Sequence, residues 1–327
     1  MIISQVRGRV AIPAAWRAWV ALLAVYFLWG STYTGIQVGV REFPPLLLAG
    51  TRYVAAGVIL YLLAGRRGGW RHLPARWQLP SRREALSAGV VGLLLLLGGN
   101  GLLTVAEVRV QSGLASLLIA TVPLFMAVLS RPLKGSRPLG LSGWCGIGLG
   151  LLGLVILVGP GASGHLDFLW ALVLLLAAFL WSVGSLYAQH APLASNVLLA
   201  SAVEMLVGGA ALLVAGLVTG EGARVHLGGV GAPAWIALAW LILAGSLAGY
   251  TCYTYSLKAM PATTVATYAY VNPLVALGLG WLILGQGLTL GAAVAALCIT
   301  LAVILMVSGP ALARRRLRRR PWWRGAG

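Results

Sequence analysis

The stretch YFLWGSTY at residues 26–33 has a near copy, AFLWSVGSLY at residues 178–187, about 150 positions later in the chain. Both copies place a tryptophan, small hydroxyl residues and a tyrosine inside a long apolar run. Tryptophan usually gathers at membrane–water interfaces rather than in the middle of apolar segments. This pair of stretches indicates that one membrane-embedded unit occurs twice in the chain.

The composition excludes an ordinary soluble domain. The chain has 327 residues, of which 60% are hydrophobic and 9% are charged, and its mean hydropathy is +0.91. Soluble domains carry about 25% charged residues. The 44 glycines are typical of helices that pack closely in lipid. The sequence therefore predicts a membrane protein with several spans.

Apolar runs set the number of spans. A helix needs about 20 apolar residues to cross the hydrocarbon core. Runs of this size predict ten transmembrane helices, at 19–40, 44–65, 85–106, 112–130, 139–158, 166–188, 195–218, 233–256, 262–284 and 288–308. The first run is long enough to span, so we expect it to be retained rather than cleaved as a signal peptide.

The basic residues predict the orientation. With the N-terminus inside, the cytoplasmic segments hold 20 Lys and Arg and the outer loops hold three, Arg41, Arg109 and Arg224. This asymmetry predicts that both termini are cytoplasmic. Because the basic residues lie in short loops, we expect no nucleic-acid partner. The tail RRRLRRRPWWRG (314–325) is expected to contact lipid headgroups.

The two halves of the chain align along their length. FLWG at 27–30 matches FLWS at 179–182, and TVPL at 121–124 matches VNPL at 271–274. Each half has five predicted helices, and because five is odd, the second copy enters the membrane in the opposite direction. The expected fold is an all-α membrane protein of two inverted repeats, an architecture typical of secondary transporters. The expected domains are a cytoplasmic N-terminus (1–18), two five-helix repeats (19–158 and 166–308) and a basic cytoplasmic tail (309–327).

The chain resembles the EamA-type exporters of the drug/metabolite transporter superfamily, and within them the YedA-like branch. The stretches that carry the resemblance are FLWGSTYTGIQVGV (27–40), FPPLLLAGTRY (43–53), GGNGLLTVAEVRVQSGLASLLIATVPLF (98–125) and SLKAMPATTVATYAYVNPL (256–274). The resemblance spans about 19–308. It implies ten helices and the export of amino acids or other small metabolites across the bacterial inner membrane.

One departure from the family pattern concerns a carboxylate. Many relatives carry a Gly-Glu pair after the fourth and ninth helices. This chain has Lys134-Gly135-Ser136 and Gly285-Gln286-Gly287 at those places. No role of that carboxylate is therefore transferred to this chain.

Arg52 is a candidate for the substrate site. It lies about nine residues into the second predicted helix, near the middle of the membrane. An ionisable side chain at that depth is costly unless it is paired or faces water. The corresponding part of the seventh helix contains Glu204, so we expect the two to pair or to border one central cavity. In the alternative interpretation, Arg52 binds helix-end carbonyls and only holds the fold.

Trp29 and Trp181 are further candidates to line a cavity, although ordinary core packing also fits them. Their indole N–H groups need partners when buried. Polar side chains follow the two tryptophans on the same helices, namely Ser31, Tyr33, Gln37 and Ser185. Aromatic walls with a few polar groups are what a small organic solute requires.

Pro123 and Pro273 occupy matching positions in the fourth and ninth predicted helices. Each lacks an N–H group and frees a carbonyl one turn earlier. They predict either bends along the substrate route or plain packing kinks. The other candidates for substrate binding are Asn100, Thr121, Tyr250, Tyr268 and Asn272. For the tyrosines, a cavity wall and an interfacial belt both fit.

The remaining chemical groups indicate no catalysis. Glu107 and Asp167 lie near outer helix ends, where we expect them to be solvated. His72, His165, His190 and His226 are predicted in loops and form no cluster, and the three cysteines lack metal-ligand spacing, so we expect no metal. No phosphate-binding loop or catalytic motif occurs, so we expect no cofactor and no enzyme activity.

The expected function is export of a small-molecule substrate by a secondary transporter that contacts membrane lipids. The alternatives are an intramembrane enzyme and a non-transporting receptor or assembly protein. Proton coupling through Glu204, exchange and uniport stay open, as do a monomer and a homodimer.

Overall fold

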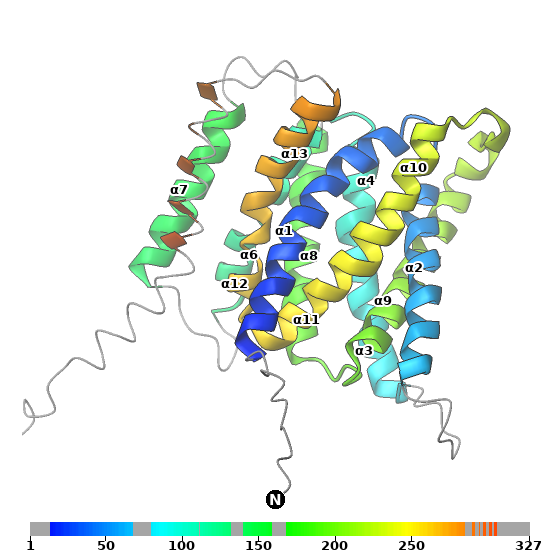
Figure 1. Ribbon diagram of the computed structural model, residues 1–327, viewed down its shortest axis with the longest axis horizontal. Coiled ribbons are helices and arrows are strands. Elements are labelled where there is room, and N and C mark those ends of the chain that lie inside the picture. Colours follow the sequence, from blue (N-terminus) through cyan, green and yellow to red (C-terminus); the bar gives the residue numbers. More distant parts are fainter. Residues whose placement is uncertain are drawn as a thin grey trace, which may run out of the picture.

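The fold is all-helical (Figure 1). A computed structural model describes residues 14–67, 80–110, 112–131, 140–158, 168–284 and parts of 290–305, and these ranges contain no β-strand. The helices before residue 160 are α1 (Ala14–Gly39), α2 (Pro45–Arg67), α3 (Arg82–Gly92), η1 (Leu93–Gly101), α4 (Leu102–Ala106), α5 (Ser112–Ile119), α6 (Val122–Leu129) and α7 (Leu141–Val158). Those after it are α8 (Phe168–His190), α9 (Val197–Val218), η2 (Glu221–Arg224), η3 (Leu227–Gly229), α10 (Ala232–Trp240), η4 (Leu241–Tyr250), α11 (Thr251–Ala259), α12 (Ala262–Val265) and α13 (Tyr268–Leu284).

The length and composition of the helices indicate a membrane protein. Among the described residues, seven helical spans are long and apolar enough to cross a bilayer: Trp16–Gly39, Pro45–Ala64, Arg82–Ala106, Phe168–His190, Val197–Val218, Ala232–Ala259 and Ala262–Ile283. The predicted spans at 112–130, 139–158 and 288–308 are not among these seven. The first consists of two helices of eight residues, the second contains only a shorter apolar helix, Leu141–Gly153, and parts of the third lie outside the described residues. The count of ten therefore stays a prediction.

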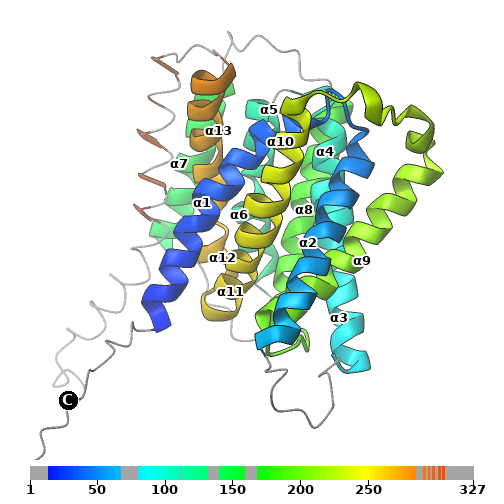
Figure 2. The same cartoon turned by 45° about the vertical axis from the view of Figure 1, so that its right-hand side comes forward.

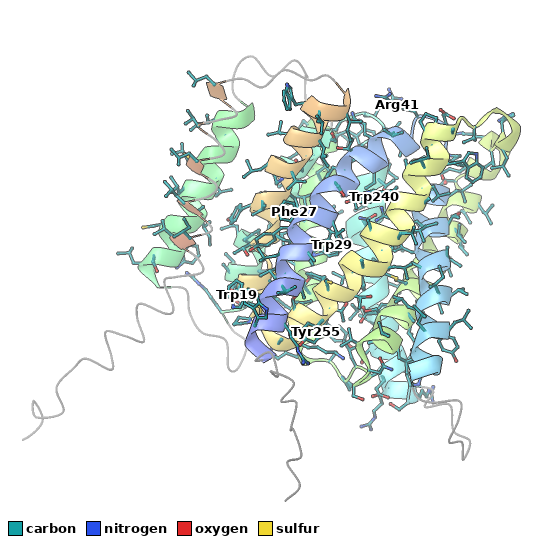
Figure 3. The ribbon with its side chains drawn as sticks, viewed as in Figure 1. Trp19, Phe27, Trp29, Arg41, Trp240 and Tyr255 are labelled. Carbon is teal, nitrogen blue, oxygen red and sulfur yellow. The ribbon has the colours of Figure 1, made fainter. Side chains whose placement is uncertain are left out.

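The outer surface of the bundle is apolar. Phe27, with 65% of its side chain exposed, points outward from the middle of α1 (Figure 3). Large exposed side chains of the same kind occur on other helices, for example Leu62, Leu176, Trp240 and Trp281. Soluble monomers rarely expose contiguous apolar surface on this scale. The surface therefore fits contact with lipid tails.

Two of the long helices contain a wider segment at their centres. The π-helix η1 joins α3 to α4, and the π-helix η4 joins α10 to α11. Such segments are frequent at functional sites, because the extra residue per turn shifts side chains away from the regular α-helical positions. Asn100 and Gly245 come from these two segments and border the same cavity.

Two other helices are interrupted. Ala120 and Thr121 separate α5 from α6, and Ala266 and Thr267 separate α12 from α13. Pro123 lies in the first turn of α6, where its missing N–H group needs no partner. Pro273 lies inside α13. The same order therefore occurs twice along the chain: two continuous α-helices (α1 and α2, α8 and α9), then a helix with a π-segment, then an interrupted helix.

The first helices of the two halves run in opposite directions. α1 ends at the upper end of Figure 1, where a short turn leads into α2, whereas α8 ends at the lower end, where it leads into α9. His190 is the last residue of α8 and not part of a loop, which corrects the expectation for this histidine.

α9 approaches its neighbours closely because glycines face them. It packs against α2 along its length and against α3 and η1 (Figure 2). A Cβ atom on Gly208 would lie 2.6 Å from the carbonyl oxygen of Gly92, and one on Gly209 would lie 2.9 Å from the backbone nitrogen of Val54. Small residues that bring helix backbones together are the usual means of helix association in lipid.

Two loop carboxylates link the ends of helices that are distant in sequence. The carboxylate of Glu221 accepts hydrogen bonds from the backbone N–H groups of Leu46 and Leu47 at the start of α2, at 3.3 and 3.0 Å. Glu42 in turn accepts a hydrogen bond from the N–H group of Gly231 just before α10. A carboxylate at a helix N-terminus binds otherwise unpaired N–H groups and is favoured by the helix dipole. These contacts fix the 40–44 turn against the 219–231 loop.

We expect Gly208→Ala to destabilise the protein by about 1–3 kcal/mol, because the added methyl group overlaps the backbone of α3. The matched control is Gly278→Ala in α13, where a Cβ would meet no atom within 4 Å. Thermal unfolding of both variants in detergent, followed by tryptophan fluorescence, measures the effect. Equal unfolding midpoints for the two variants would contradict the close packing of α9.

Candidate functional site

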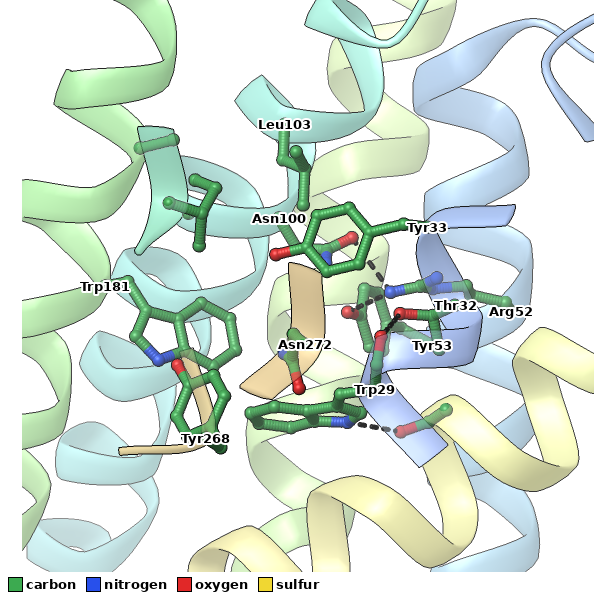
Figure 4. A pocket seen from close by; sticks show the side chains of 14 residues that line it. Trp29, Thr32, Tyr33, Arg52, Tyr53, Asn100, Leu103, Trp181, Tyr268 and Asn272 are labelled. Carbon is green, nitrogen blue, oxygen red and sulfur yellow. Dashed lines mark hydrogen bonds between the residues drawn. The ribbon is translucent and has the colours of Figure 1, made fainter. Parts of the chain in front are cut away.

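A cavity lies between helices from both halves of the chain (Figure 4). The part of it that water-sized molecules can occupy is small, about 40 Å³. Among the lining residues, the aromatic side chains gather on one side and polar side chains on the other. They are Trp29, Thr32, Tyr33, Arg52, Tyr53, Gly99, Asn100, Leu103, Ile119, Ala177, Trp181, Gly245, Tyr268 and Asn272.

Trp29 and Trp181 form the aromatic side together with Tyr268. The ring of Trp29 meets the ring of Trp181 edge-on at 5.4 Å between centroids and the ring of Tyr268 edge-on at 5.0 Å. The Trp29 indole N–H group donates a hydrogen bond of 2.9 Å to the carbonyl oxygen of Gly245. Edge-on pairs are a favourable geometry for aromatic rings. The wall is therefore a packed, preformed surface.

Glycines on η4 allow Trp29 to reach this position. A Cβ atom on Gly249 would lie 2.6 Å from the indole nitrogen of Trp29, and one on Gly245 would lie 2.7 Å from the methyl carbon of Thr32. These two glycines thus serve helix contacts within one copy of the chain.

Arg52 forms the polar side of the cavity and is only 3% exposed. One of its terminal nitrogens, Nη2, donates a hydrogen bond of 2.9 Å to the side-chain oxygen of Asn100 and another to the hydroxyl of Tyr53. Its guanidinium group lies 4.4 Å from the centroid of the Tyr53 ring. Its other two nitrogens, Nε and Nη1, have no partner. No carboxylate of a described residue lies within ion-pair distance of this cation.

A buried guanidinium with unpaired N–H groups beside a cavity has donors that an anion can accept from. The planar fork of arginine presents parallel donors that match the two oxygens of a carboxylate or the oxygens of a phosphate. Asn100 and Tyr53 hold the fork in place from one side. Chemically, the unpaired N–H groups of Arg52 suit the oxygens of an anionic ligand.

Asn272 brings the interrupted helix α13 to the cavity. With its amide oriented to satisfy both groups, it donates hydrogen bonds to the carbonyl oxygens of Tyr268 and Tyr26, at 3.0 and 3.2 Å. The hydroxyls of Tyr26 and Thr267 lie 2.6 Å apart and link α1 to the interruption before α13. The break in the helix thus places Tyr268 and Asn272 against α1.

Glu204 lies at a separate, smaller space. Its carboxylate accepts a hydrogen bond of 2.9 Å from the hydroxyl of Tyr250, and the space next to it is also lined by Tyr253 and Lys258. Arg52 and Glu204 form no ion pair and do not border the same cavity. The structure therefore does not place these two charges as the pairing hypothesis expects.

Seven of the thirteen predicted binding residues line the cavity: Trp29, Tyr33, Arg52, Asn100, Trp181, Tyr268 and Asn272. The other six have different partners. Ser31 accepts from Trp240, Gln37 accepts from Ser112, Thr121 donates to Leu118, Ser185 bonds to Tyr253, and Glu204 accepts from Tyr250. Tyr250 and Tyr253 are buried beside Trp29, so an interfacial belt does not describe them.

The sequence reasoning missed three polar residues. Thr32 and Tyr53 line the cavity, and Glu107 is only 4% exposed. Residues three and four positions apart share a helix face, so helical spacing from Trp29 selects Thr32 and Tyr33 rather than Ser31. The expectation that Glu107 is solvated was wrong, because its side chain faces the protein interior while its neighbours Val108 and Arg109 are exposed. Asp167 lies outside the described residues.

No three His, Cys, Asp or Glu side chains come together as a metal site in the described part of the chain.

Comparison with known proteins links the chain to transporters. The description "EamA-like transporter family" matches residues 16–159 and again 168–308. The inner membrane transporter YedA of Escherichia coli K12, described as uncharacterized, is 38% identical over 294 residues, which cover 88% of this chain and 90% of YedA. The transporter YoaV of Bacillus subtilis, also described as uncharacterized, is 25% identical over 87% of this chain and 94% of its own length. A solved crystal structure with 20% identity has the same fold, with a TM-score of 0.70 over 91% of this chain and 98% of that chain.

Removing the Tyr250 hydroxyl, which donates a hydrogen bond to Glu204, tests whether this bond outside the cavity stabilises the protein. We expect Tyr250→Phe to destabilise the protein by about 1–3 kcal/mol, because it leaves a buried carboxylate without any hydrogen-bond donor. The control is Tyr270→Phe, which removes a buried hydroxyl that has no partner and should be neutral or slightly stabilising. The unfolding midpoints in detergent decide between them, and a Tyr250→Phe midpoint equal to that of the unmodified protein would refute the role of this bond.

Proposed function

The chain belongs to the EamA-like transporter family, and we propose that it is a secondary transporter that exports small organic molecules by alternating access. The observation that carries this proposal is the buried cavity in which Arg52 and the tryptophans meet. The cavity is lined by Trp29, Arg52 and Asn100 from the first region that the family matches and by Trp181 and Asn272 from the second. A site between two related halves is where a rocking motion exposes a ligand to alternate sides.

In the proposed architecture, residues 19–158 and 166–308 are two inverted five-helix repeats between a cytoplasmic N-terminus (1–18) and a cytoplasmic tail (309–327). Support comes from the two ranges that the family matches and from the opposite directions of α1 and α8. Corresponding hydrogen bonds add further support. Arg52 bonds to Asn100 between α2 and η1, and Glu204 bonds to Tyr250 between α9 and η4. The paired positions are 152 and 150 residues apart, close to the repeat offset.

The proposed substrates are amino-acid-like compounds or drugs. The free N–H groups of Arg52 supply donors for a carboxylate, and the aromatic wall suits an apolar body. A small amphipathic solute would contact both, its anionic group the donors of Arg52 and its apolar part the aromatic wall. This assignment rests on the cavity rather than on the fold, since one fold can host many functions.

We propose the bacterial inner membrane as the location, with both termini in the cytoplasm. The excess of Lys and Arg on one side of the predicted topology supports this orientation. The relative YedA, described as an inner membrane transporter, supports the location.

The alternatives are a non-transporting intramembrane enzyme and a membrane receptor or assembly protein. The family of transporters and the buried Arg52 cavity favour transport over both. A proton-coupled, an exchange and a uniport mechanism are compatible with the proposal, as are a monomer and a homodimer.

Flux measurements test transport and the role of Arg52. Purified protein in proteoliposomes is expected to move at least one compound from a panel of radiolabelled amino acids and drugs faster than protein-free liposomes do. We expect Arg52→Gln to lower the flux of carboxylate compounds about tenfold or more, because the charged donors are lost. Arg109→Gln, which changes an exposed arginine, serves as the matched control. Absence of flux for every compound would refute the proposed function.

Thiol labelling tests the topology. In a variant without Cys145, Cys252 and Cys298, single cysteines are introduced before residue 14, after residue 310 and at Gly229 in the exposed loop before α10. A membrane-impermeant reagent applied to intact cells is expected to label only the cysteine at Gly229, because both termini are cytoplasmic. Labelling of one terminus but not the other in intact cells would refute the inverted repeat.

A further inference from the structure

Gln37 and Gln189 occupy corresponding positions in the two halves of the chain. They are 152 residues apart, the offset that also separates the FLWG and FLWS stretches. Each glutamine follows the cavity-lining tryptophan of its own helix, Trp29 in α1 and Trp181 in α8, by eight residues, which is about 12 Å of helix. Because α1 ends at the upper end of Figure 1 and α8 ends at the lower end, the two glutamines lie on opposite sides of the cavity.

Gln37 joins α1 to the first part of the interrupted helix of its half. Its side-chain oxygen accepts a hydrogen bond of 2.8 Å from the hydroxyl of Ser112, the first residue of α5. Figure 2 shows α5 at the upper end of the bundle, close to the end of α1. We call this hydrogen bond the upper contact. α5 ends at Ile119, which lines the cavity, so the upper contact holds a cavity-lining helix against α1.

Gln189 joins α8 to the turn that precedes the interrupted helix of its half. Its side-chain nitrogen donates hydrogen bonds to the carbonyl oxygens of Leu257 and Met260, at 3.1 and 3.0 Å. In a continuing helix the carbonyl of Leu257 would accept from the residue four positions later, which is Pro261 and has no N–H group. We call these two hydrogen bonds the lower contact. Lys258 reinforces it, since its Nζ donates a hydrogen bond of 2.6 Å to a carbonyl oxygen in the loop between α8 and α9.

Both contacts hold the part of an interrupted helix that lies beyond its break. The break at 120–121 separates α5 from α6, and the break at 266–267 separates α12 from α13. A helix bends most easily where its regular hydrogen bonds are interrupted. Movement of α5 about the first break would open the cavity at the upper end. Movement of α12 and the preceding turn about the second break would open it at the lower end.

We propose that Gln37 and Gln189 are positioning residues of the transport cycle. The upper contact closes the cavity toward the outer side, the lower contact closes it toward the cytoplasm, and each contact breaks in the half of the cycle in which the cavity opens to its side. The inference rests on the proposed function, because it assumes that the cavity opens to alternate sides. Neither glutamine lines the cavity, so each acts on the direction in which the cavity opens and not on the bound substrate.

The accessibility of one thiol in the cavity measures which end is open. In a variant without Cys145, Cys252 and Cys298, Ala177→Cys places a single thiol in the cavity lining. A membrane-impermeant thiol reagent is applied to right-side-out and to inside-out membrane vesicles that contain the full-length protein. The ratio of the two labelling rates, outer side over cytoplasmic side, reports the balance between the two open forms.

The two glutamine variants are expected to shift this ratio in opposite directions. Gln37→Leu should raise it about fivefold, because one hydrogen bond that closes the outer end is lost. Gln189→Leu should lower it about fivefold or more, because two hydrogen bonds that close the cytoplasmic end are lost. The double variant should return toward the ratio of the unmodified protein. A merely structural role would not produce opposite shifts that cancel.

A milder pair of variants on α5 gives an independent test. Ser112→Ala removes the other partner of the upper contact and should reproduce the shift of Gln37→Leu. The matched control is Ser116→Ala, which removes a hydroxyl that donates to the carbonyl oxygen of Gly113 within its own helix, at 2.7 Å. This control should leave the ratio unchanged. Each change removes a single oxygen atom, so the pair stays informative if the leucine variants fail to fold.

Several results would overturn the proposal. They are shifts of the same sign in Gln37→Leu and Gln189→Leu, an unchanged ratio in both, and equal ratios for Ser112→Ala and Ser116→Ala. A thiol at position 177 that stays unlabelled from both sides in every variant also overturns it, because neither end then opens. Flux through the unmodified protein in proteoliposomes would leave the proposed function standing after any of these results. Absence of flux for every compound refutes the proposed function itself, which the labelling ratios do not test.

Discussion

The absence of water in the membrane core is the constraint on which this structure depends. Every polar group there must find a partner inside the protein, so the backbone is helical and hydroxyl groups bond to their own helix. Thr32, Ser182 and Ser185 each donate to a carbonyl oxygen three or four residues earlier, at 2.7, 2.7 and 2.6 Å. Several buried polar atoms nevertheless have no hydrogen-bond partner, among them Nε and Nη1 of Arg52 and both carboxylate oxygens of Glu107.

The same constraint explains why the site is formed where regular helices fail. The π-helical segments η1 and η4 supply Asn100 and Gly245, and the interruption before α13 supplies Tyr268 and Asn272. Irregular backbone within a membrane is stable only where other protein groups or a wet cavity satisfy it. The close approach of α9 to α2 and α3 through Gly208 and Gly209 provides a compact frame around these irregular segments.

The lining side chains of the cavity, and the charge of Arg52 in particular, determine which ligands would fit it; the fold alone does not. A solved structure with 20% identity shares the fold with this chain but says nothing about its ligand. The edge-on wall of Trp29 and Trp181 and the fork of Arg52 are the features on which we base the proposal of a substrate with an apolar body and an anionic group.

The sequence by itself determined the location and nature of the helices, because long apolar runs leave a chain few alternatives in lipid. It predicted a span at 44–65 where α2 is Pro45–Arg67, and it identified Trp29, Trp181 and Arg52 as unusual at their depth. Only the tertiary structure decided which faces turn inward, placing Thr32 rather than Ser31 at the cavity, separating Glu204 from Arg52 and burying Glu107. The physical reason is that helices apolar on all sides carry little periodic signal, so their rotation is set by packing against neighbours.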